Sequence, residues 1–268
     1  MTQRSEADPA AGAAILFDGV SKRFTRADGS ELLAVENVSF ALPCGRIVAL
    51  LGPSGSGKTT LLNIAAGLIE PDAGEVRIAG RNRAEADWSR VGYMFQDDRL
   101  VPWRNAANNI ALALEAGPSR IAERRARSLA MLDLVGLREF SDTYPHELSG
   151  GMRSRIALGR SLVTEADILL MDEPFARLDV QTRVNMHAQV LRLQASRNLA
   201  VLFVTHDADE AVALADDVVV LSPRPGRIRR IVKIALPRPR IANADAFFLA
   251  AELRAQIGDE SSSISADA

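Results

Sequence analysis

A glycine-rich loop between an apolar run and a helical pattern constrains the fold of this 268-residue chain more than any other feature. The apolar run Ile47–Leu51 is typical of a strand buried on both faces of a sheet. The loop that follows matches G-x-x-x-x-G-K-[ST], and residues 59–67 read as the helix that it opens. Such a loop wraps backbone N–H groups around phosphate, while its lysine neutralises charge and its hydroxyl can bind Mg²⁺. The predicted phosphate-binding residues are Gly52, Pro53, Ser54, Gly55, Ser56, Gly57, Lys58, Thr59 and Thr60.

The lysine of this loop is informative because lysine is rare in the chain. Among 32 basic residues, Lys22, Lys58 and Lys233 are the lysines, and all the others are arginine. The alternative to a phosphate loop is a Gly-Ser turn that contains a lysine by chance. Since a strand and a helix flank the loop as the pattern requires, we favour the phosphate loop.

Polar residues also end two further apolar runs. Asp172 closes the run that begins at Ile168, where a carboxylate is unfavourable unless a cation such as Mg²⁺ meets it. Glu173 follows directly and could accept a proton from an attacking water. His206 ends the run Val201–Thr205, so we expect it at the same edge of the sheet. Taken singly, the Asp-Glu pair could be a polar strand end and the histidine a structural residue, but the glycine loop favours a shared site.

A second anion-binding turn is predicted at Ser149, Gly150 and Gly151, before a helical pattern over 152–162. Its exposed N–H groups and the positive end of the helix suit a phosphate. One nucleotide site has no need of two such turns, so we expect two chains to share the active site. The alternative is a Gly-Gly loop that merely starts an arginine-rich helix.

Strand and helix patterns alternate through most of the chain, which predicts an α/β fold with a mostly parallel sheet. Short strands at 15–20, 38–42 and 75–78, around a turn at Asp28-Gly29, predict an antiparallel β subdomain at the N-terminus. From 105 to 144 the spacing is helical with no strand signal, which predicts an inserted helical subdomain. The predicted boundaries are a disordered tail over 1–13, the main domain over 14–240 with the helical subdomain at about 97–160, a C-terminal helix over 241–257 and a second disordered tail over 258–268.

Composition excludes several classes of protein. A net charge of −2 and a pI near 6.0 give no basic field, so nucleic acid is not an expected partner. No apolar run approaches the ~18 residues that cross a bilayer, so we expect a soluble chain that reaches a membrane only through a partner. The single cysteine, Cys44, excludes an internal disulfide.

In their order along the chain, these motifs resemble the ATPase subunit of an ABC transporter, over roughly residues 15 to 235. The resemblance implies a P-loop NTPase core that binds ATP and Mg²⁺ and hydrolyses ATP. It also implies a head-to-tail homodimer in which Ser149 and Gly150 of one copy face the ATP held by the other. The implied catalytic residues are Lys58, Gln96, Glu173 and His206, and the implied metal ligands are Thr59, Gln96 and Asp172.

The family assigns further roles at matching positions. Gln96, after 91–95, would reach the metal and water and hinge the helical subdomain, although a glutamine at a strand end is unremarkable by itself. Phe24 would stack on adenine, the alternative being a core aromatic. His206 would sense the γ-phosphate, and Asp179 would lie in the loop that links the two sites. The chain departs from the family at Met152, where Gln is commoner, and at Arg177.

Two segments, 100–105 and 220–228, resemble the bacterial importers of nitrate, aliphatic sulfonates and taurine. This resemblance implies transmembrane permease subunits, an extracytoplasmic solute-binding protein as an indirect partner, and a peripheral place on the cytoplasmic face of the bacterial inner membrane. Leu100–Trp103 is the candidate permease contact, unless Trp103 packs inside the helical subdomain.

Three alternative functions remain at this point. A non-transport ABC-type ATPase usually carries two such domains in one chain or a long coiled-coil insertion, and we expect neither within these 268 residues. A small-molecule kinase would explain Lys58 and Asp172 but leaves Ser149-Gly150-Gly151 without a role. An exporter subunit is often fused to membrane helices, so import of nitrate, a sulfonate, taurine or another small molecule is favoured.

Overall fold

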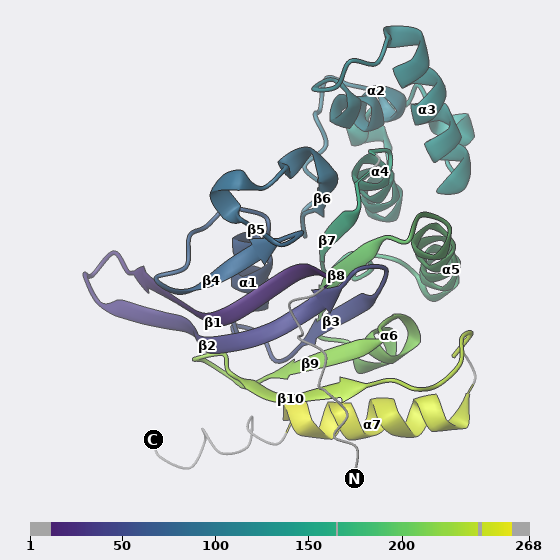
Figure 1. Cartoon of the computed structure of the whole chain (residues 1–268). Helices are drawn as coiled ribbons and strands as arrows, with labels where there is room; N and C mark the ends of the chain where they lie inside the picture. Colours follow the sequence, from purple (N-terminus) through teal and green to yellow (C-terminus); the bar gives the residue numbers. More distant parts are fainter. Residues whose placement is uncertain (1–11, 165, 241–242, 259–268) are drawn as a thin grey trace.

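The computed structural model describes residues 12–164, 166–240 and 243–258 (Figure 1). Its central sheet has the strand order β10-β9-β3-β8-β7-β6. Pairing is parallel from β9 to β6, while β10 is antiparallel to β9, so the expected mostly parallel core is confirmed. The strands are β3 (Ile47–Leu51), β6 (Val91–Met94), β7 (Ile168–Asp172), β8 (Ala200–Thr205), β9 (Asp217–Leu221) and β10 (Ile228–Lys233).

The central strand β3 shows why its sequence is continuously apolar. Ile47, Ala49 and Leu51 pack into one hydrophobic cluster with the helices on one face of the sheet. Val48 and Leu50 pack into a second cluster on the opposite face. Because successive side chains of a strand point to opposite faces, a strand covered on both sides has no position for a polar residue.

A second sheet is antiparallel, with the order β2-β1-β4-β5, and forms the left side of Figure 1. Its strands are longer than the sequence predicts, because β1 and β2 stay paired out to Thr25 and Glu31 beside the turn at Asp28-Gly29. The outer part of this hairpin is largely exposed or half-buried and mixes polar with apolar side chains, so it carries no clear alternating pattern. The strands are β1 (Ala13–Thr25), β2 (Glu31–Pro43), β4 (Ala73–Ile78) and β5 (Arg81–Asn82).

Helices cover both faces of the central sheet. One face packs against α1 (Lys58–Ala65) and the antiparallel sheet, and the other packs against α5 (Val180–Arg197) and α6 (Ala208–Leu214). The last helix, α7 (Ala244–Gly258), lies along β10 and α6 (Figure 1) and buries Ala246, Ala250 and Leu253.

Three helices stand above this core in the upper part of Figure 1: α2 (Ala106–Ala111), α3 (Ile121–Leu134) and α4 (Gly150–Leu162). Buried Ile110, Leu132 and Ile156 join them to the large hydrophobic cluster. The chain from 97 to 149 enters no strand. Short 3-10 helices connect several elements, at Arg83–Glu85, Trp88–Arg90, Leu112–Leu114, Arg138–Phe140 and Pro145–Glu147.

Both predicted tails fall mainly outside the described residues, which exclude 1–11 and 259–268. Ala13 already belongs to β1, and Gly258 ends α7. Among the described helices, none is both long enough and apolar enough to span a bilayer.

Candidate active site

The predicted site residues follow strands that are neighbours in the sheet. The glycine loop follows β3, Glu173 follows β7, and His206 follows β8. Gln96 lies two residues beyond β6. Because β3, β8, β7 and β6 are adjacent and parallel, their carboxyl ends meet at one edge, where ligands bind in open α/β sheets.

The glycine loop curls around the side chain of Lys58. This side chain is buried, and its Nζ donates hydrogen bonds of 2.8 Å to the carbonyl oxygens of Gly52 and Pro53. Burial lowers the pKa of Lys58, and the nearby charges of Glu173 and Asp172 oppose that shift. The ammonium group is therefore held inside the loop, close to where a phosphate would bind.

Two glycines fix the shape of the loop. Gly57 has a φ of 85°, and a Cβ there would lie 2.2 Å from Val35 Cγ1. Gly226, from the turn after β9, packs so closely that a Cβ would lie 2.0 Å from the Ser56 carbonyl oxygen. Only glycine allows both approaches, so the loop is supported by β2 on one side and by the β9–β10 turn on the other.

Thr59 and Asp172 bring a hydroxyl and a carboxylate together. Thr59 Oγ1 donates to Asp172 Oδ1 over 3.1 Å, and Asp172 is only 4% exposed. Burial raises the pKa of Asp172, and the charge of Glu173 adds to this rise, whereas the Thr59 hydrogen bond and Lys58 oppose it. A buried carboxylate beside a hydroxyl suits Mg²⁺, which takes hard oxygen ligands.

Glu173 lies between two other predicted side chains. Gln96 Nε2 donates to Glu173 Oε2 over 3.3 Å, and His206 Nδ1 lies 3.2 Å from Glu173 Oε1. The backbone of Glu173 has a φ of 47°, which is uncommon outside glycine and turns the chain at the end of β7. Its N–H donates to the Val204 carbonyl on β8, which holds this turn in place. The three side chains thus form one polar cluster across the ends of β6, β7 and β8.

A pocket of about 320 Å³ joins the glycine loop to this cluster. Phe24 is 37% exposed and lines the pocket, so it is a surface aromatic and not a core residue. The lining residues are Phe24, Leu32, Ala34, Ser54, Gly55, Gly57, Lys58, Thr59, Thr60, Gln96, Glu173 and Arg224.

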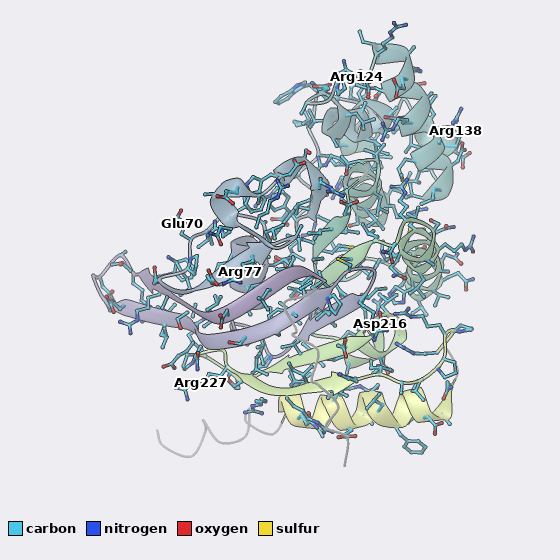
Figure 2. All side chains as sticks on the ribbon, viewed as in Figure 1. Glu70, Arg77, Arg124, Arg138, Asp216 and Arg227 are labelled. Atoms are coloured by element: carbon cyan, nitrogen blue, oxygen red, sulfur yellow. The ribbon has the colours of Figure 1, made fainter. Side chains whose placement is uncertain are left out.

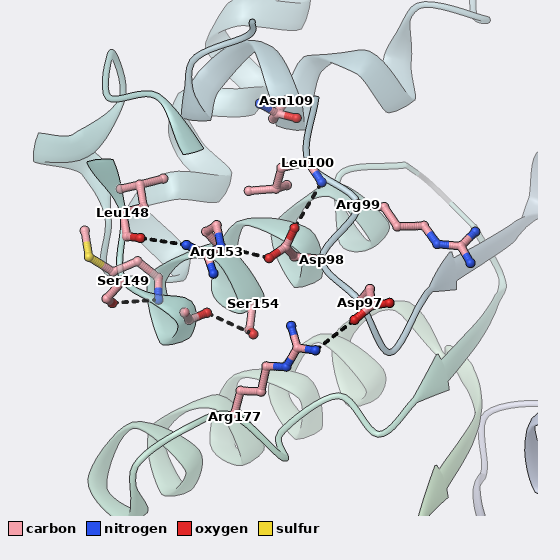
Figure 3. Close-up of polar contacts among 12 residues, drawn as sticks. Asp97, Asp98, Arg99, Leu100, Asn109, Leu148, Ser149, Arg153, Ser154 and Arg177 are labelled. Atoms are coloured by element: carbon pink, nitrogen blue, oxygen red, sulfur yellow. Dashed lines mark hydrogen bonds and ion pairs between the residues drawn. The ribbon is translucent and has the colours of Figure 1, made fainter. Parts of the chain in front are cut away.

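Ser149, Gly150, Gly151 and Asp179 do not line this pocket. Ser149 caps α4, where its Oγ accepts a hydrogen bond from Met152 N over 3.3 Å (Figure 3). Asp179 caps α5, and the hydrogen bond from the Thr182 N–H lowers the pKa of its carboxyl. Both cap residues therefore belong to helix starts that are separate from the pocket of their own chain.

The segment after Gln96 is tied to the neighbouring elements by two ion pairs (Figure 3). Arg177 Nη2 lies 2.8 Å from Asp97 Oδ1, and Arg153 Nε lies 2.9 Å from Asp98 Oδ2. Arg177, a departure from the family pattern, therefore has a partner in this chain. The other departure, Met152, has a partly buried side chain that packs against the hydrophobic core.

A buried asparagine holds the next part of this segment. Asn109 is fully buried; its Oδ1 accepts from Val101 N over 2.7 Å, and its Nδ2 donates to Arg104 O over 2.7 Å. Trp103 lies on this fixed loop and is 78% exposed, so the alternative in which it packs inside the helical subdomain is wrong.

Arg224, Leu32 and Ala34 also line the pocket, and no pattern in the sequence predicts a role for them there. The turn at 223–226 is recognisable as a turn from its prolines and glycine. Its place beside the glycine loop depends on β9 lying next to β3, which no local signal in the sequence reveals.

Together, the loop after β3, the helix that it opens and the carboxylates at the end of β7 define a P-loop nucleotide-binding protein. The family model described as ABC transporter matches residues 35–176, which is more than half of the chain. The chain therefore belongs to the ABC transporter family.

Relatives at about 40% identity are named as import ATP-binding proteins. The taurine import protein TauB of Rhizobium johnstonii is 43% identical over 80% of its own length and 79% of this chain. The aliphatic sulfonates import protein SsuB of Burkholderia ambifaria is 41% identical over 74% of its length and 95% of this chain. The nitrate import protein NrtC of Synechococcus elongatus is 41% identical over 84% of this chain, which spans only 35% of that longer relative. The predicted resemblance to these importers is confirmed.

A solved structure shows the same architecture. It is described as a dimeric, post-hydrolysis state of an ATP-binding cassette bound to ADP and Pi. It is 29% identical to this chain and has a TM-score of 0.76. The match spans 100% of that structure's chain and 83% of this chain. The chain thus has the fold of ATP-hydrolysing cassettes, which favours an ABC ATPase over the alternative of a small-molecule kinase.

Proposed function

We propose that this chain is the ATP-binding and ATP-hydrolysing subunit of an importer for a small anionic solute of the nitrate, sulfonate or taurine type. Lys58 and Glu173 line one pocket, and the buried Asp172 is hydrogen-bonded to Thr59, which also lines it. This arrangement carries the proposal, because it joins a phosphate-binding cation to two carboxylates. The names of the relatives support the class of solute.

In the proposed reaction, Lys58 neutralises the phosphates within the loop and Glu173 accepts the proton of the attacking water. His206 and Gln96 contact opposite oxygens of the Glu173 carboxylate, so they are suited to orient it toward that water. His206 also offers a ring nitrogen that can respond to the γ-phosphate.

Mg²⁺ would be held by Thr59 and Asp172, with Gln96 as a further oxygen ligand, and would neutralise phosphate charge when bound. The described residues form no cluster of three or more His, Cys, Asp or Glu side chains suited to a metal. Mg²⁺ does not require such a cluster, since proteins commonly bind it through one or two carboxylates together with substrate phosphates.

We propose that two copies of the chain form each active site. Ser149, Gly150 and Gly151 start α4 but do not line the pocket of their own chain, so another molecule is needed to bring them to a phosphate. The dimeric cassette with a similar fold supports this arrangement. A homodimer would then hold two nucleotides.

The proposed transport partners are permease subunits, and through them an extracytoplasmic solute-binding protein. The chain would lie at the cytoplasmic face of the bacterial inner membrane, attached through the permease. The exposed Trp103, on a loop that Asn109 fixes, offers an apolar contact for such a partner.

Phosphate release tests the proposed chemistry. The purified chain with Mg²⁺ and ATP is expected to release inorganic phosphate, and no small acceptor is expected to become labelled from γ-³²P-ATP. Transfer of label to an acceptor, with no free phosphate, would favour a kinase and contradict the proposal.

Trp103→Ala tests the permease contact. The variant is expected to keep its basal ATPase rate, because Trp103 does not line the pocket, and to lose most of the stimulation that a reconstituted permease gives. Phe248→Ala, at another exposed aromatic, is the matched control and should leave stimulation intact. Equal stimulation of Trp103→Ala and the unmodified chain would remove Trp103 from the interface.

A further inference from the structure

We propose that Arg224 is a second cation of the nucleotide pocket and binds the phosphate chain of the nucleotide together with Lys58. This inference rests on the proposed function and adds a residue to its site. It assigns a binding role to the turn between β9 and β10, where Arg224 lies 169 residues along the chain from Gly55 of the glycine loop.

The side chain of Arg224 extends over the glycine loop. Its Nε donates to the Gly55 carbonyl oxygen over 3.3 Å, and a Cβ built on Gly55 would lie 2.9 Å from Arg224 Nη2. Arg224 lines the same pocket as Lys58 and Phe24. The guanidinium group is thus placed at the pocket by the backbone of the phosphate-binding loop itself.

The turn that carries Arg224 is fixed to the loop and to β2. Gly226 N donates to Ala34 O over 2.9 Å, and Glu36 N donates to Gly226 O over 3.0 Å. The close approach of Gly226 to the Ser56 carbonyl adds a tight contact with the glycine loop. Because its backbone is held on both sides, Arg224 reaches the pocket from a rigid support.

Arg224 differs from Arg227, the other arginine of this turn, in the charges that surround it. Arg227 forms an ion pair with Glu36, with Nη2 and Oε2 2.6 Å apart, and is labelled beside the hairpin in Figure 2. Within the described part of the chain, Arg224 has no carboxylate partner, and the Gly55 carbonyl accepts its one hydrogen bond. A guanidinium group has five N–H donors in a planar fork that matches phosphate oxygens. The remaining donors of Arg224 are therefore suited to an anion in the pocket.

Nucleotide binding tests this role separately from turnover. Titration calorimetry with ADP is expected to show affinity about tenfold weaker for Arg224→Ala than for the unmodified chain, the loss typical of one charge-assisted hydrogen bond. Arg224→Lys should recover part of that loss. Arg227→Ala, which breaks only an exposed ion pair of the same turn, should bind ADP as the unmodified chain does. Circular dichroism of each variant checks that the fold is intact.

The outcomes separate this inference from the proposed function. Unchanged ADP affinity in Arg224→Ala, or an equal loss in Arg224→Ala and Arg227→Ala, would overturn the inference while leaving the nucleotide site in place. Failure of the unmodified chain to bind ADP would overturn the proposed function and this inference with it. If adenosine affinity falls as much as ADP affinity in Arg224→Ala, the side chain contacts the nucleoside and the assignment to phosphate is wrong.

Discussion

Glu173→Gln is expected to bind ATP as the unmodified chain does and to lose nearly all hydrolysis, a fall of about a hundredfold or more. Glutamine has almost the shape of glutamate, so contacts with Gln96 and His206 can persist, but an amide cannot accept a proton from water. Binding persists because Lys58 and the glycine loop are unchanged. Phosphate release and equilibrium binding of a fluorescent ATP analogue measure the two effects separately.

The matched control is Glu70→Gln, which makes the same change at an exposed residue outside the pocket (Figure 2). Glu70→Gln should bind ATP and hydrolyse it as the unmodified chain does. If Glu173→Gln retained full hydrolysis, another group would activate the water, and the proposed role of the polar cluster at the strand ends would be wrong.

Gly150→Asp is expected to abolish hydrolysis while leaving ADP binding to the isolated chain unchanged. An aspartate at this turn would face the γ-phosphate held by the second copy, and such a like-charge contact lowers turnover by about a hundredfold or more. The substitution should fold normally, because the nearest atom to a Cβ on Gly150 is Arg153 Nη2 at 4.0 Å. An acidic residue at the start of α4 is also compatible with the helix dipole.

Gly117→Asp is the control for this charge, since Gly117 is exposed in the helical segment and a Cβ there would meet only Leu114 O at 3.7 Å. A mixing experiment gives a sharper test of the shared site. When inactive Gly150→Asp and inactive Glu173→Gln are combined, a mixed dimer holds one site with Glu173 and Gly150 both intact, so turnover should return. Continued inactivity of the mixture, although mixed dimers form, would contradict the two-chain site.

Much of the candidate site could be predicted from sequence because its parts lie at the ends of short apolar runs. The loop after Ile47–Leu51 and the carboxylates after Ile168 are local patterns, and parallel strand order brings them to one edge. The residue types and local sequence around Gln96 and Phe24 do not by themselves indicate a binding site. Only the resemblance to a family indicated them, and the structure places both at the pocket.

The features that could not be predicted depend on contacts between distant segments. The ion pair of Arg177 with Asp97 joins residues 80 positions apart, so Arg177 was only an unexplained departure in the sequence. Arg224 reaches the pocket only because β9 pairs with β3. The full length of the β1–β2 hairpin was also missed, because its outer residues are paired by backbone hydrogen bonds and not by burial.

The position of the Lys58 ammonium within its own loop has a consequence for how a nucleotide enters. Its Nζ donates to the carbonyls of Gly52 and Pro53 over 2.8 Å and lies 3.5 Å from Ser56 Oγ, so its three N–H donors already have partners within the loop. An arriving phosphate that draws this group outward exchanges existing hydrogen bonds for new ones. Lys58 therefore adds less to the free energy of phosphate binding than an ammonium group without protein partners would.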